Sequence, residues 1–305
     1  MKNQKVKIIV TGGAGFVGSH IVDQLVSNGY EVHVVDNLSA GKKENINPKA
    51  IFHNVDIRDK EKLISVFKNT QYVFHEAAFP QVQYSIENPV ETNEINVIGT
   101  LNVLEASRIN KVKRVIFASS SAIYGSQEKL PITEDMQVNP LSPYGAQKYI
   151  SEVYMKLYSQ IYGLETVSLR YFNAYGPRQS ASGAYASVIP KFIEFRKKNE
   201  PLTITGDGEQ TRDFVNVKDV VSANILAMKG KEVGKGEVLN IGGSSQYSIN
   251  YIAKLIGGNI SYIPPRIEPR NTQASILKAK EFLNWEPCVI LEEGIKELKK
   301  YHNIN

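Results

Sequence analysis

Residues 11–20 read TGGAGFVGSH, and this stretch decides the fold. An apolar run at 6–11 precedes it, and apolar residues recur at helical spacing over 16–27, which predicts a strand, a tight loop and a helix. Its glycines recur at every third position, as Gly12, Gly15 and Gly18. Small residues there let a pyrophosphate approach the helix N-terminus, whose free N–H groups favour anions. The stretch therefore predicts a dinucleotide-binding loop.

An acidic residue follows the second predicted strand, 31–35. Asp36 lies 18 residues beyond Gly18, close to the spacing of about 20 expected for a carboxylate that binds the ribose hydroxyls of NAD. Such a carboxylate repels the 2′-phosphate of NADP, and no arginine follows it immediately, so NAD is the predicted cofactor. The alternative is a strand-end aspartate that caps a turn. Asp56 is a candidate for the adenine edge, and an ordinary helix N-cap explains it equally well.

The first half of the chain alternates strand-like and helix-like segments. Strands are predicted at 6–11, 31–35, 51–54, 72–75, 114–118 and 166–170, and helices at 16–27, 59–68, 93–110 and 144–162. This alternation is typical of a parallel sheet with helices on both faces. Beyond about residue 173 prolines and glycines loosen the pattern, and helices are predicted at 186–198, 217–229, 249–256 and 291–302. The predicted fold class is α/β: a Rossmann-type doubly wound parallel sheet with a smaller mixed α/β C-terminal domain.

Composition excludes several classes of protein. The 305 residues are 42% hydrophobic and 22% charged, as in an ordinary folded domain. The net charge of +5 comes from dispersed basic residues, which favours a solvated surface over nucleic-acid binding and helps to attract an anionic substrate. The five histidines do not stand at metal-ligand spacing, so no metal site is expected.

Location is inferred from cysteine and hydropathy. Cys288 is the single cysteine, so these 305 residues hold no intrachain disulfide, and a reducing compartment is favoured. No stretch approaches the roughly 18 apolar residues of a membrane span, and residues 1–7 lack the apolar core of a signal peptide. We therefore expect a cytoplasmic protein with no membrane partner.

Two neighbouring motifs carry candidate chemistry. Tyr144 and Lys148 are four residues apart on a predicted helix, so they share one face, and no other tyrosine of the chain has a lysine at this spacing. An ammonium group is expected to lower the pKa of the tyrosine, which then removes a proton from a sugar hydroxyl. Ser119, Ser120 and Ser121 follow the strand 114–118, at the edge where such sheets bind ligands. The alternatives are a helix-surface pair and serines that satisfy loop amides.

The sequence resembles the extended short-chain dehydrogenase/reductase family, and within it the UDP-hexose 4-epimerases. The resemblance rests on TGGAGFVGSH at 11–20, VDNLSAG at 35–41, HEAA at 75–78, SSSAIYG at 119–125, YGAQK at 144–148, RYFNAYGPR at 170–178 and TRDFVNVKDV at 211–220. It implies an NAD-binding domain of residues 1–172, with 213–242 returning to it, and a nucleotide-sugar-binding domain of 173–212 and 243–305. It also implies a homodimer formed by the helices near 93–110 and 144–162.

The resemblance assigns roles to individual residues. Tyr144 is implied as catalytic acid/base, with Lys148 and Ser120 as its catalytic partners. The implied cofactor-binding residues are Gly12, Gly15, Phe16, Val17, Asp36, Asn37, Ser39, Gly41, Asp56, Ile57, Ala77, Ala78, Asn96, Ser119, Tyr144, Lys148 and Tyr171. Ala77 and Asn96 are expected to line the cofactor channel, with Tyr171 near the nicotinamide.

The implied substrate-binding residues are Ser120, Ser121, Tyr144, Asn173, Gln179, Val188, Thr203, Arg212, Arg266, Glu268 and Thr272. Arg212 and Arg266 are expected to hold the two phosphates, and Glu268 the uridine ribose. Guanidinium groups match phosphate oxygens, which supports the arginines independently. The alternative for Arg212 is a surface salt bridge to Asp213 or Asp219.

The residues after Ser120 select among the reactions of this family. The 4,6-dehydratases and the UDP-glucuronate decarboxylases carry acidic residues there, whereas this chain has Ser121 and Ala122, which are unsuited to general acid catalysis. The expected activity is NAD-dependent interconversion of UDP-glucose and UDP-galactose through a 4-keto intermediate. Thr272, Ser121 and Gln179 resemble epimerases that accept N-acetylated sugars, so UDP-N-acetylglucosamine is the first alternative and UDP-glucuronate the second. A nucleotide-sugar dehydrogenase or reductase, or a non-catalytic NAD-binding protein, remains as a different class.

Overall fold

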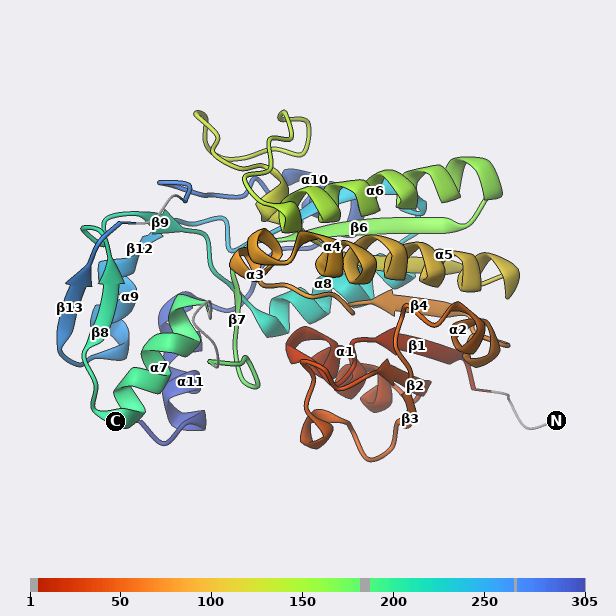
Figure 1. Cartoon of the computed structure of the whole chain (residues 1–305), viewed down its shortest axis with the longest axis horizontal. Helices are drawn as coiled ribbons and strands as arrows, with labels where there is room; N and C mark the ends of the chain where they lie inside the picture. The colour runs from red at the N-terminus through yellow and green to blue at the C-terminus, as the bar shows by residue number, and fades with distance from the viewer. Residues whose placement is uncertain (1–4, 182–186, 266–267, 305) are drawn as a thin grey trace.

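A seven-stranded parallel sheet forms the centre of the molecule in the computed structural model, which describes residues 5–181, 187–265 and 268–304 (Figure 1). Its strand order is β11-β6-β5-β4-β1-β2-β3. The strands are β1 Lys7–Thr11, β2 Glu31–Asp36, β3 Ile51–Asn54, β4 Tyr72–His75, β5 Arg114–Ser120, β6 Glu165–Tyr171 and β11 Lys235–Ile241. The chain moves outward from β1 in one direction and then returns to build the other side, so a crevice opens beyond the carboxyl ends of β1 and β4. The predicted doubly wound fold is confirmed.

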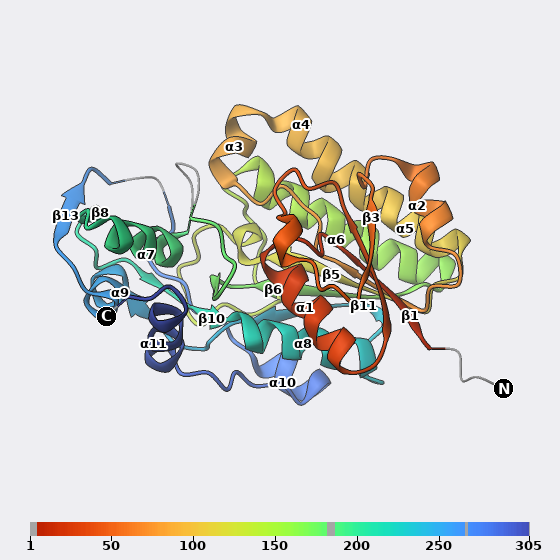
Figure 2. The same ribbon diagram turned by 90° about the horizontal axis from the view of Figure 1, so that it is seen from below.

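Helices cover both faces of this sheet (Figure 2). One face carries α1 Phe16–Ser27 and α8 Val217–Lys229, and the other carries α2 Lys60–Val66, α5 Gly99–Ile109 and α6 Pro143–Tyr162. Local sequence explains the ends of α6: Ser142 Oγ accepts a hydrogen bond from Gly145 N at 3.2 Å, Pro143 occupies the first turn, and Gly163 closes the helix with a φ of +68°.

The helix predicted at 93–110 is interrupted. It consists of α4 Pro89–Asn93, a π-helical turn Glu94–Ile98 and α5. The sequence analysis did not predict α3 Val82–Glu87 or the short helical turns η1 Lys43–Asn45 and η3 Ser121–Ile123. Both α3 and α4 pack on α6, so their formation depends on a helix that lies far along the chain.

A smaller body stands beside the carboxyl edge of the sheet, on the left of Figure 1. Its elements are β8 Leu202–Thr205, which pairs in parallel with β13 Ile260–Ile263, and the helices α7 Val188–Lys198, α9 Ile249–Ile256 and α11 Leu291–Tyr301. A separate apolar core holds it together. Two short pairs connect it to the sheet: β7 Ala174–Tyr175 with β10 Val215–Asn216, and β9 Thr211–Arg212 with β12 Tyr247–Ser248.

The last part of the chain crosses between the two bodies. α10 Leu277–Leu283 and Trp285 pack in the core of the large sheet, where the indole Nε1 of Trp285 donates a hydrogen bond to Asp219 O at 3.1 Å. The carboxylate of Asp219 in turn accepts backbone N–H groups from Cys288 and Val289. The expected assignment of 243–305 entirely to the smaller domain therefore does not describe this segment. No helix in the described ranges is long and apolar enough to cross a membrane.

Candidate active site

One continuous cleft of ≈ 1570 Å³ runs along the carboxyl edge of the sheet and under the smaller body. It is lined by every residue that the sequence analysis assigned to cofactor or substrate and that the structure describes, with the exception of Asn96. Arg266 lies outside the described residues. The lining residues include the glycine loop and Asp36 from β1, α1 and β2, Ser120 and Tyr144 from β5 and α6, and Arg212 from β9.

The glycine loop has no room for side chains. Gly12 has a φ of +69°, and a Cβ on it would lie 2.6 Å from the backbone nitrogen of Ala77. A Cβ on Gly18 would overlap the carbonyl oxygen of Gly12. No side chain caps the N-terminus of α1, which begins at Phe16, so its first N–H groups face the cleft entrance as donors for an anion. The loop therefore fits a bound pyrophosphate.

Asp36 holds the loop from the neighbouring strand. Its carboxylate accepts hydrogen bonds from Ala14 N at 3.0 Å and from Leu38 N at 2.8 Å. The turn-capping interpretation is thus correct for the bond to Leu38. Each carboxylate oxygen can accept two hydrogen bonds, so the same group still offers acceptors to ribose hydroxyls.

Asp56 lies further along the same wall of the cleft. It accepts a hydrogen bond from Asn37 Nδ2 at 2.8 Å and pairs with Arg58, whose hydrogen bonds lower the pKa of Asp56 to about 2. The N-cap of α2 is Asp59, which accepts a bond from Lys62 N, so the N-cap alternative for Asp56 is wrong.

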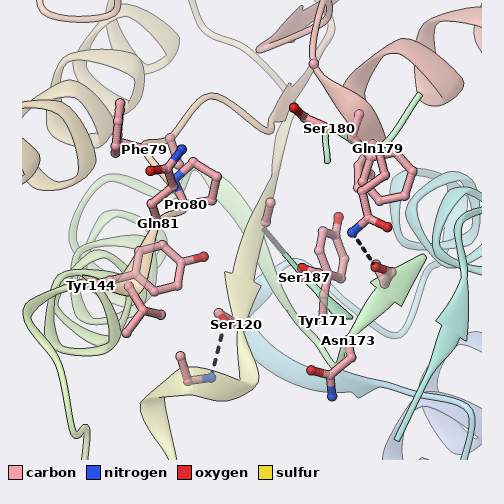
Figure 3. A pocket seen from close by; sticks show the side chains of 18 of the residues that line it. Phe79, Pro80, Gln81, Ser120, Tyr144, Tyr171, Asn173, Gln179, Ser180 and Ser187 are labelled. Atoms are coloured by element: carbon pink, nitrogen blue, oxygen red, sulfur yellow. Dashed lines mark hydrogen bonds between the residues drawn. The ribbon is translucent and has the colours of Figure 1, made fainter. Parts of the chain in front are cut away.

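Tyr144 and Lys148 project from α6 toward the end of β5, and Figure 3 shows the phenol of Tyr144 on the side of the cleft opposite Tyr171. The ammonium group of Lys148 is buried and donates a hydrogen bond to Ala118 O at 2.7 Å. Burial lowers the pKa of Lys148 to about 8. Burial also raises the pKa of Tyr144 to about 12, and the hydrogen bond with Ser120 opposes this rise. Lys148 was expected to lower the pKa of Tyr144, but in the structure burial dominates.

The structure separates the roles of the three serines. Ser119 Oγ donates to Glu152 Oε1 at 2.5 Å, so this hydroxyl is occupied behind the wall. Ser120 Oγ accepts a bond from Ala122 N at 3.1 Å and faces the cleft beside Tyr144 (Figure 3). Ser121 begins the turn η3 and also lines the cleft. Ser120 is therefore the serine whose hydroxyl lies in the cleft next to the phenol of Tyr144.

The part of the cleft assigned to the substrate contains Arg212 and two buried polar atoms without partners in the described part of the chain. Arg212 pairs with Glu268 at 2.8 Å, and neither Asp213 nor Asp219 is its partner: both bind backbone N–H groups elsewhere. Gln179 Oε1 and Thr203 Oγ1 are buried without a hydrogen-bond partner among the described residues. Buried polar atoms in a cleft wall without partners mark places where a polar ligand is accommodated.

Asn96 has a different place from the one predicted. Its side-chain oxygen accepts a hydrogen bond from Phe79 N at 2.7 Å, and its amide nitrogen donates to Phe79 O and to Gln147. It is buried behind the cleft wall instead of lining it. Asn96 therefore acts on the cleft by fixing the backbone at Phe79.

Glu76 is a cleft residue that the sequence analysis did not single out. It accepts a hydrogen bond from Tyr171 OH at 3.1 Å, and Tyr171 OH accepts one from Asn224 Nδ2 at 2.7 Å. Burial raises the pKa of Glu76 to about 7. The available signal was a charged residue directly after the strand ending at His75. Phe79 and Gln81, on the loop that follows, also face the cleft opposite Tyr171 (Figure 3).

Comparison with known proteins agrees with this geometry. Residues 8–242 match the model of the NAD dependent epimerase/dehydratase family. A putative UDP-glucose 4-epimerase of Methanocaldococcus jannaschii is 45% identical over 306 residues, which cover 98% of this chain and 99% of that protein. The structure of the UDP-glucose 4-epimerase of Thermotoga maritima with UDP-glucose matches with a TM-score of 0.94 and 44% identity, over 98% of this chain and 99% of that one.

A third relative is the UDP-N-acetylglucosamine 4-epimerase of Methanobrevibacter ruminantium in complex with UDP-N-acetylmuramic acid. Its structure matches with a TM-score of 0.93 and 37% identity, over 98% of both chains. The resemblance found in the motifs is confirmed. The chain therefore belongs to the NAD-dependent epimerase/dehydratase family.

Proposed function

We propose that this chain is an NAD-dependent 4-epimerase that interconverts UDP-glucose and UDP-galactose through a 4-keto intermediate. The observation that carries the proposal is that one cleft is lined by the dinucleotide loop, by Tyr144 with Ser120 and Lys148, and by Arg212. The relatives named UDP-glucose 4-epimerase, which cover nearly the whole chain, support the same activity.

The described residues fit NAD as the cofactor. The side-chain-free glycine loop accepts the pyrophosphate, and Asp36 offers oxygens to the adenosine ribose. NAD held there would supply the hydride acceptor and donor for chemistry at the sugar C4, together with the positive charge of its oxidised nicotinamide.

The protein groups move the proton. Tyr144 removes the proton of the sugar 4-hydroxyl and later returns it, with the Ser120 hydroxyl hydrogen-bonded beside it. Because burial holds the pKa of Tyr144 near 12, its phenolate needs nearby positive charge. The ammonium group of Lys148, 5.9 Å from the centre of the Tyr144 ring, supplies this charge.

The substrate-binding end holds the nucleotide while the sugar turns. The guanidinium of Arg212 pairs with Glu268, and its N–H groups also donate hydrogen bonds to the diphosphate of the substrate. Asn173 lines the same stretch and donates its amide to Asp213 O, which fixes its orientation. We assign Gln179 Oε1 and Thr203 Oγ1 to donors of the sugar nucleotide, because both lack a partner in the described protein.

The proposal is tested by proton NMR of purified protein with UDP-glucose and no added nicotinamide. Formation of UDP-galactose establishes 4-epimerisation with retained NAD. Protein that contains NAD but converts neither UDP-glucose nor the related UDP-hexoses would contradict the proposal, and turnover only with added NAD would indicate a dehydrogenase.

A second candidate substrate is UDP-N-acetylglucosamine. Ser121 and Thr272 line the cleft as small side chains, which leaves space for an N-acetyl group. The likeness to a UDP-N-acetylglucosamine 4-epimerase points the same way. Parallel assays with UDP-glucose, UDP-N-acetylglucosamine and UDP-glucuronate rank the three by kcat/KM.

A homodimer and a cytoplasmic location complete the proposal. One face of α6 carries an exposed apolar stripe beside α5: Tyr149, Ile150, Val153, Leu157 and Ile161. A contiguous apolar stripe of this kind is typical of a surface that a partner covers. Light scattering after size-exclusion chromatography should give twice the chain mass of 34.0 kDa. The single cysteine, Cys288, supports a reducing compartment.

A further inference from the structure

A buried side-chain network lies directly behind the cleft wall that carries Ser120. Tyr144, Lys148 and Glu152 follow one another at intervals of four residues, so they share a face of α6. Lys148 Nζ donates to Ala118 O at 2.7 Å, and Glu152 Oε1 accepts from Ser119 Oγ at 2.5 Å. The helix is thus attached to two successive residues of β5, immediately before Ser120.

Glu152 also neutralises a buried cation. Arg170, in β6, donates from Nε to Glu152 Oε1 at 2.9 Å and from the guanidinium NH2 to Oε2 at 2.7 Å. The two side chains are 4% and 3% exposed, so water neither screens nor replaces this bidentate pair. Removing the carboxylate charge alone would leave Arg170 as an unpaired buried cation close to the catalytic helix.

The network continues across the sheet. Arg170 NH1 donates to Tyr124 OH at 2.7 Å, and Tyr124 OH donates to Asn240 Oδ1 at 2.6 Å. Asn240 Nδ2 then donates to Ile132 O at 3.0 Å. Ile132 forms a β-bridge with Ala274, which lies two positions after the cleft residue Thr272. One hydrogen-bonded chain therefore connects α6, β5, β6 and β11 behind the reacting groups.

We propose that Glu152 is a positioning residue for proton transfer, which fixes Ser119, and through it the adjoining Ser120, and acts on Lys148 one turn away on the same face of α6. The inference rests on the proposed epimerase function. Glu152 does not reach the cleft, so it acts through Ser119 and Lys148 and touches neither cofactor nor substrate.

Several charged or titratable groups face Lys148 from the surrounding elements. His75 ends β4 and Glu76 follows it directly, Tyr144 and Glu152 lie on α6, and Arg170 lies on β6 behind Glu152. Glu76 and Glu152 both raise the pKa of Lys148, against burial, which lowers it. Replacing Glu152 with a neutral group should therefore make Lys148 lose its proton at lower pH.

The test compares Glu152→Gln with Glu165→Gln. Glu165 pairs with Arg114 at the opposite ends of β5 and β6, so it is the same kind of ion pair far from the cleft, although more exposed. For Glu152→Gln we expect kcat to fall about tenfold to a hundredfold, with KM for the UDP-sugar unchanged. The alkaline limb of the kcat profile should move down by about one pH unit. Glu165→Gln should change neither.

A second readout does not depend on turnover. Carbon NMR titration of the lysine side chains, with Lys148 assigned through Lys148→Met, should show a lowered pKa of Lys148 in Glu152→Gln only. Wild-type protein without epimerase activity would refute the proposed function, whereas this titration would still decide the role of Glu152. Equal losses of kcat in both variants, or an unmoved Lys148, would refute the positioning role.

Ser119→Ala keeps the test decisive if Glu152→Gln does not fold. This variant removes the hydroxyl and leaves the Arg170–Glu152 pair intact, so the pKa of Lys148 should stay and kcat should fall about threefold. Wild-type kcat in Ser119→Ala would contradict the connection through Ser119.

Discussion

Two arginine–glutamate pairs stand at opposite ends of β5 and β6, and their surroundings differ. At the amino ends, Arg114 pairs with Glu165 and donates its remaining N–H groups to four backbone carbonyls around the end of α8: Ala227, Met228, Gly230 and Val233. At the carboxyl ends, Arg170 pairs with Glu152, whose neighbours are the side chains Ser119 and Tyr124.

The two ion pairs differ in function because they lie at different ends of the same strands. Arg114 satisfies the unpaired carbonyls of a helix terminus, which is a structural task. Arg170 lies near the carboxyl ends of the strands, where ligands bind, and its partner Glu152 raises the pKa of the cleft residue Lys148. We therefore expect changes at the carboxyl ends to alter catalysis, and changes at the amino ends to alter stability alone.

The largest effect should follow loss of the phenol at the carboxyl edge. Tyr144→Phe removes the proton acceptor, and kcat should fall about a hundredfold to ten-thousandfold, because general acid–base groups contribute that much. Bound NAD should remain, since the loop and Asp36 are untouched. Tyr149→Phe, on the exposed side of the same helix, is the control and should keep wild-type kcat. Near-normal turnover of Tyr144→Phe would remove Tyr144 from the mechanism.

Arg212→Met should act on binding. Loss of a guanidinium that faces a phosphate costs about 2–3 kcal/mol, which corresponds to a rise in KM of about thirtyfold to a hundredfold with little change in kcat. Arg270→Met is the matched control, because Arg270 pairs with Asp207 on the surface of the same body. A large effect of Arg270→Met, or none of Arg212→Met, would place the diphosphate elsewhere.

Arg114→Met tests the structural role of the ion pair at the amino ends of β5 and β6. It removes the donors at the end of α8 and should lower the free energy of unfolding by about 2 kcal/mol, with kcat unchanged at a temperature where the protein is folded. Urea unfolding measures the loss. Arg108→Met, which breaks an exposed pair with Glu105, should lower the free energy of unfolding much less than Arg114→Met, because solvent screens the pair. A fall in kcat for Arg114→Met without a fall in stability would contradict the purely structural role of this ion pair.

Sequence patterns predicted the sheet core well because its signals are local. Helix α1, Phe16–Ser27, and strands Ile51–Asn54 and Tyr72–His75 have their predicted bounds, since short apolar runs mark the strands and Gly15 and Gly29 flank the helix. Strand β11 was missed. Its segment KGEVLNI is rich in charge and glycine, and it becomes a strand by pairing with the distant β6. The two-residue strand pairs β7 with β10 and β9 with β12 were also not predicted from apolar periodicity, because they too form by pairing of distant segments.

The candidate site likewise has parts that local sequence indicates and parts that depend on distant residues. The glycine loop, Asp36 and the Tyr144–Lys148 spacing depend on contiguous residues, so the sequence indicates them. The family resemblance indicated Ser120, but the physical reason that separates it from Ser119 is Glu152, which comes 33 positions later and occupies the Ser119 hydroxyl. Likewise, Asn96 was assigned to the channel, but its contact with Phe79 is visible only in three dimensions.

The smallest effect we predict concerns pH and a residue at the carboxyl edge of the sheet that does not line the cleft. His75 ends β4, and its ring nitrogens contact the hydroxyls of Thr11 and Thr100 at 2.8 and 2.9 Å. Burial lowers the pKa of His75 to about 3, whereas an unfolded histidine titrates near 6.5. The folded state thus binds fewer protons, so this contribution to stability is complete above about pH 6.5 and is lost as the pH falls toward 3.

Between pH 6.5 and 5.5 the contribution should fall by about 1 kcal/mol. Urea unfolding at the two pH values measures this change, and His75→Gln should reduce the difference by that amount relative to wild type. His33 and His53 also have pKa values lowered by burial, so part of the pH dependence should remain in the variant. Because His75 does not line the cleft, the acid limb of kcat should not move with it. A shifted limb would mean that carboxyl-edge position alone, without contact to the reacting groups, is enough to couple a residue to catalysis.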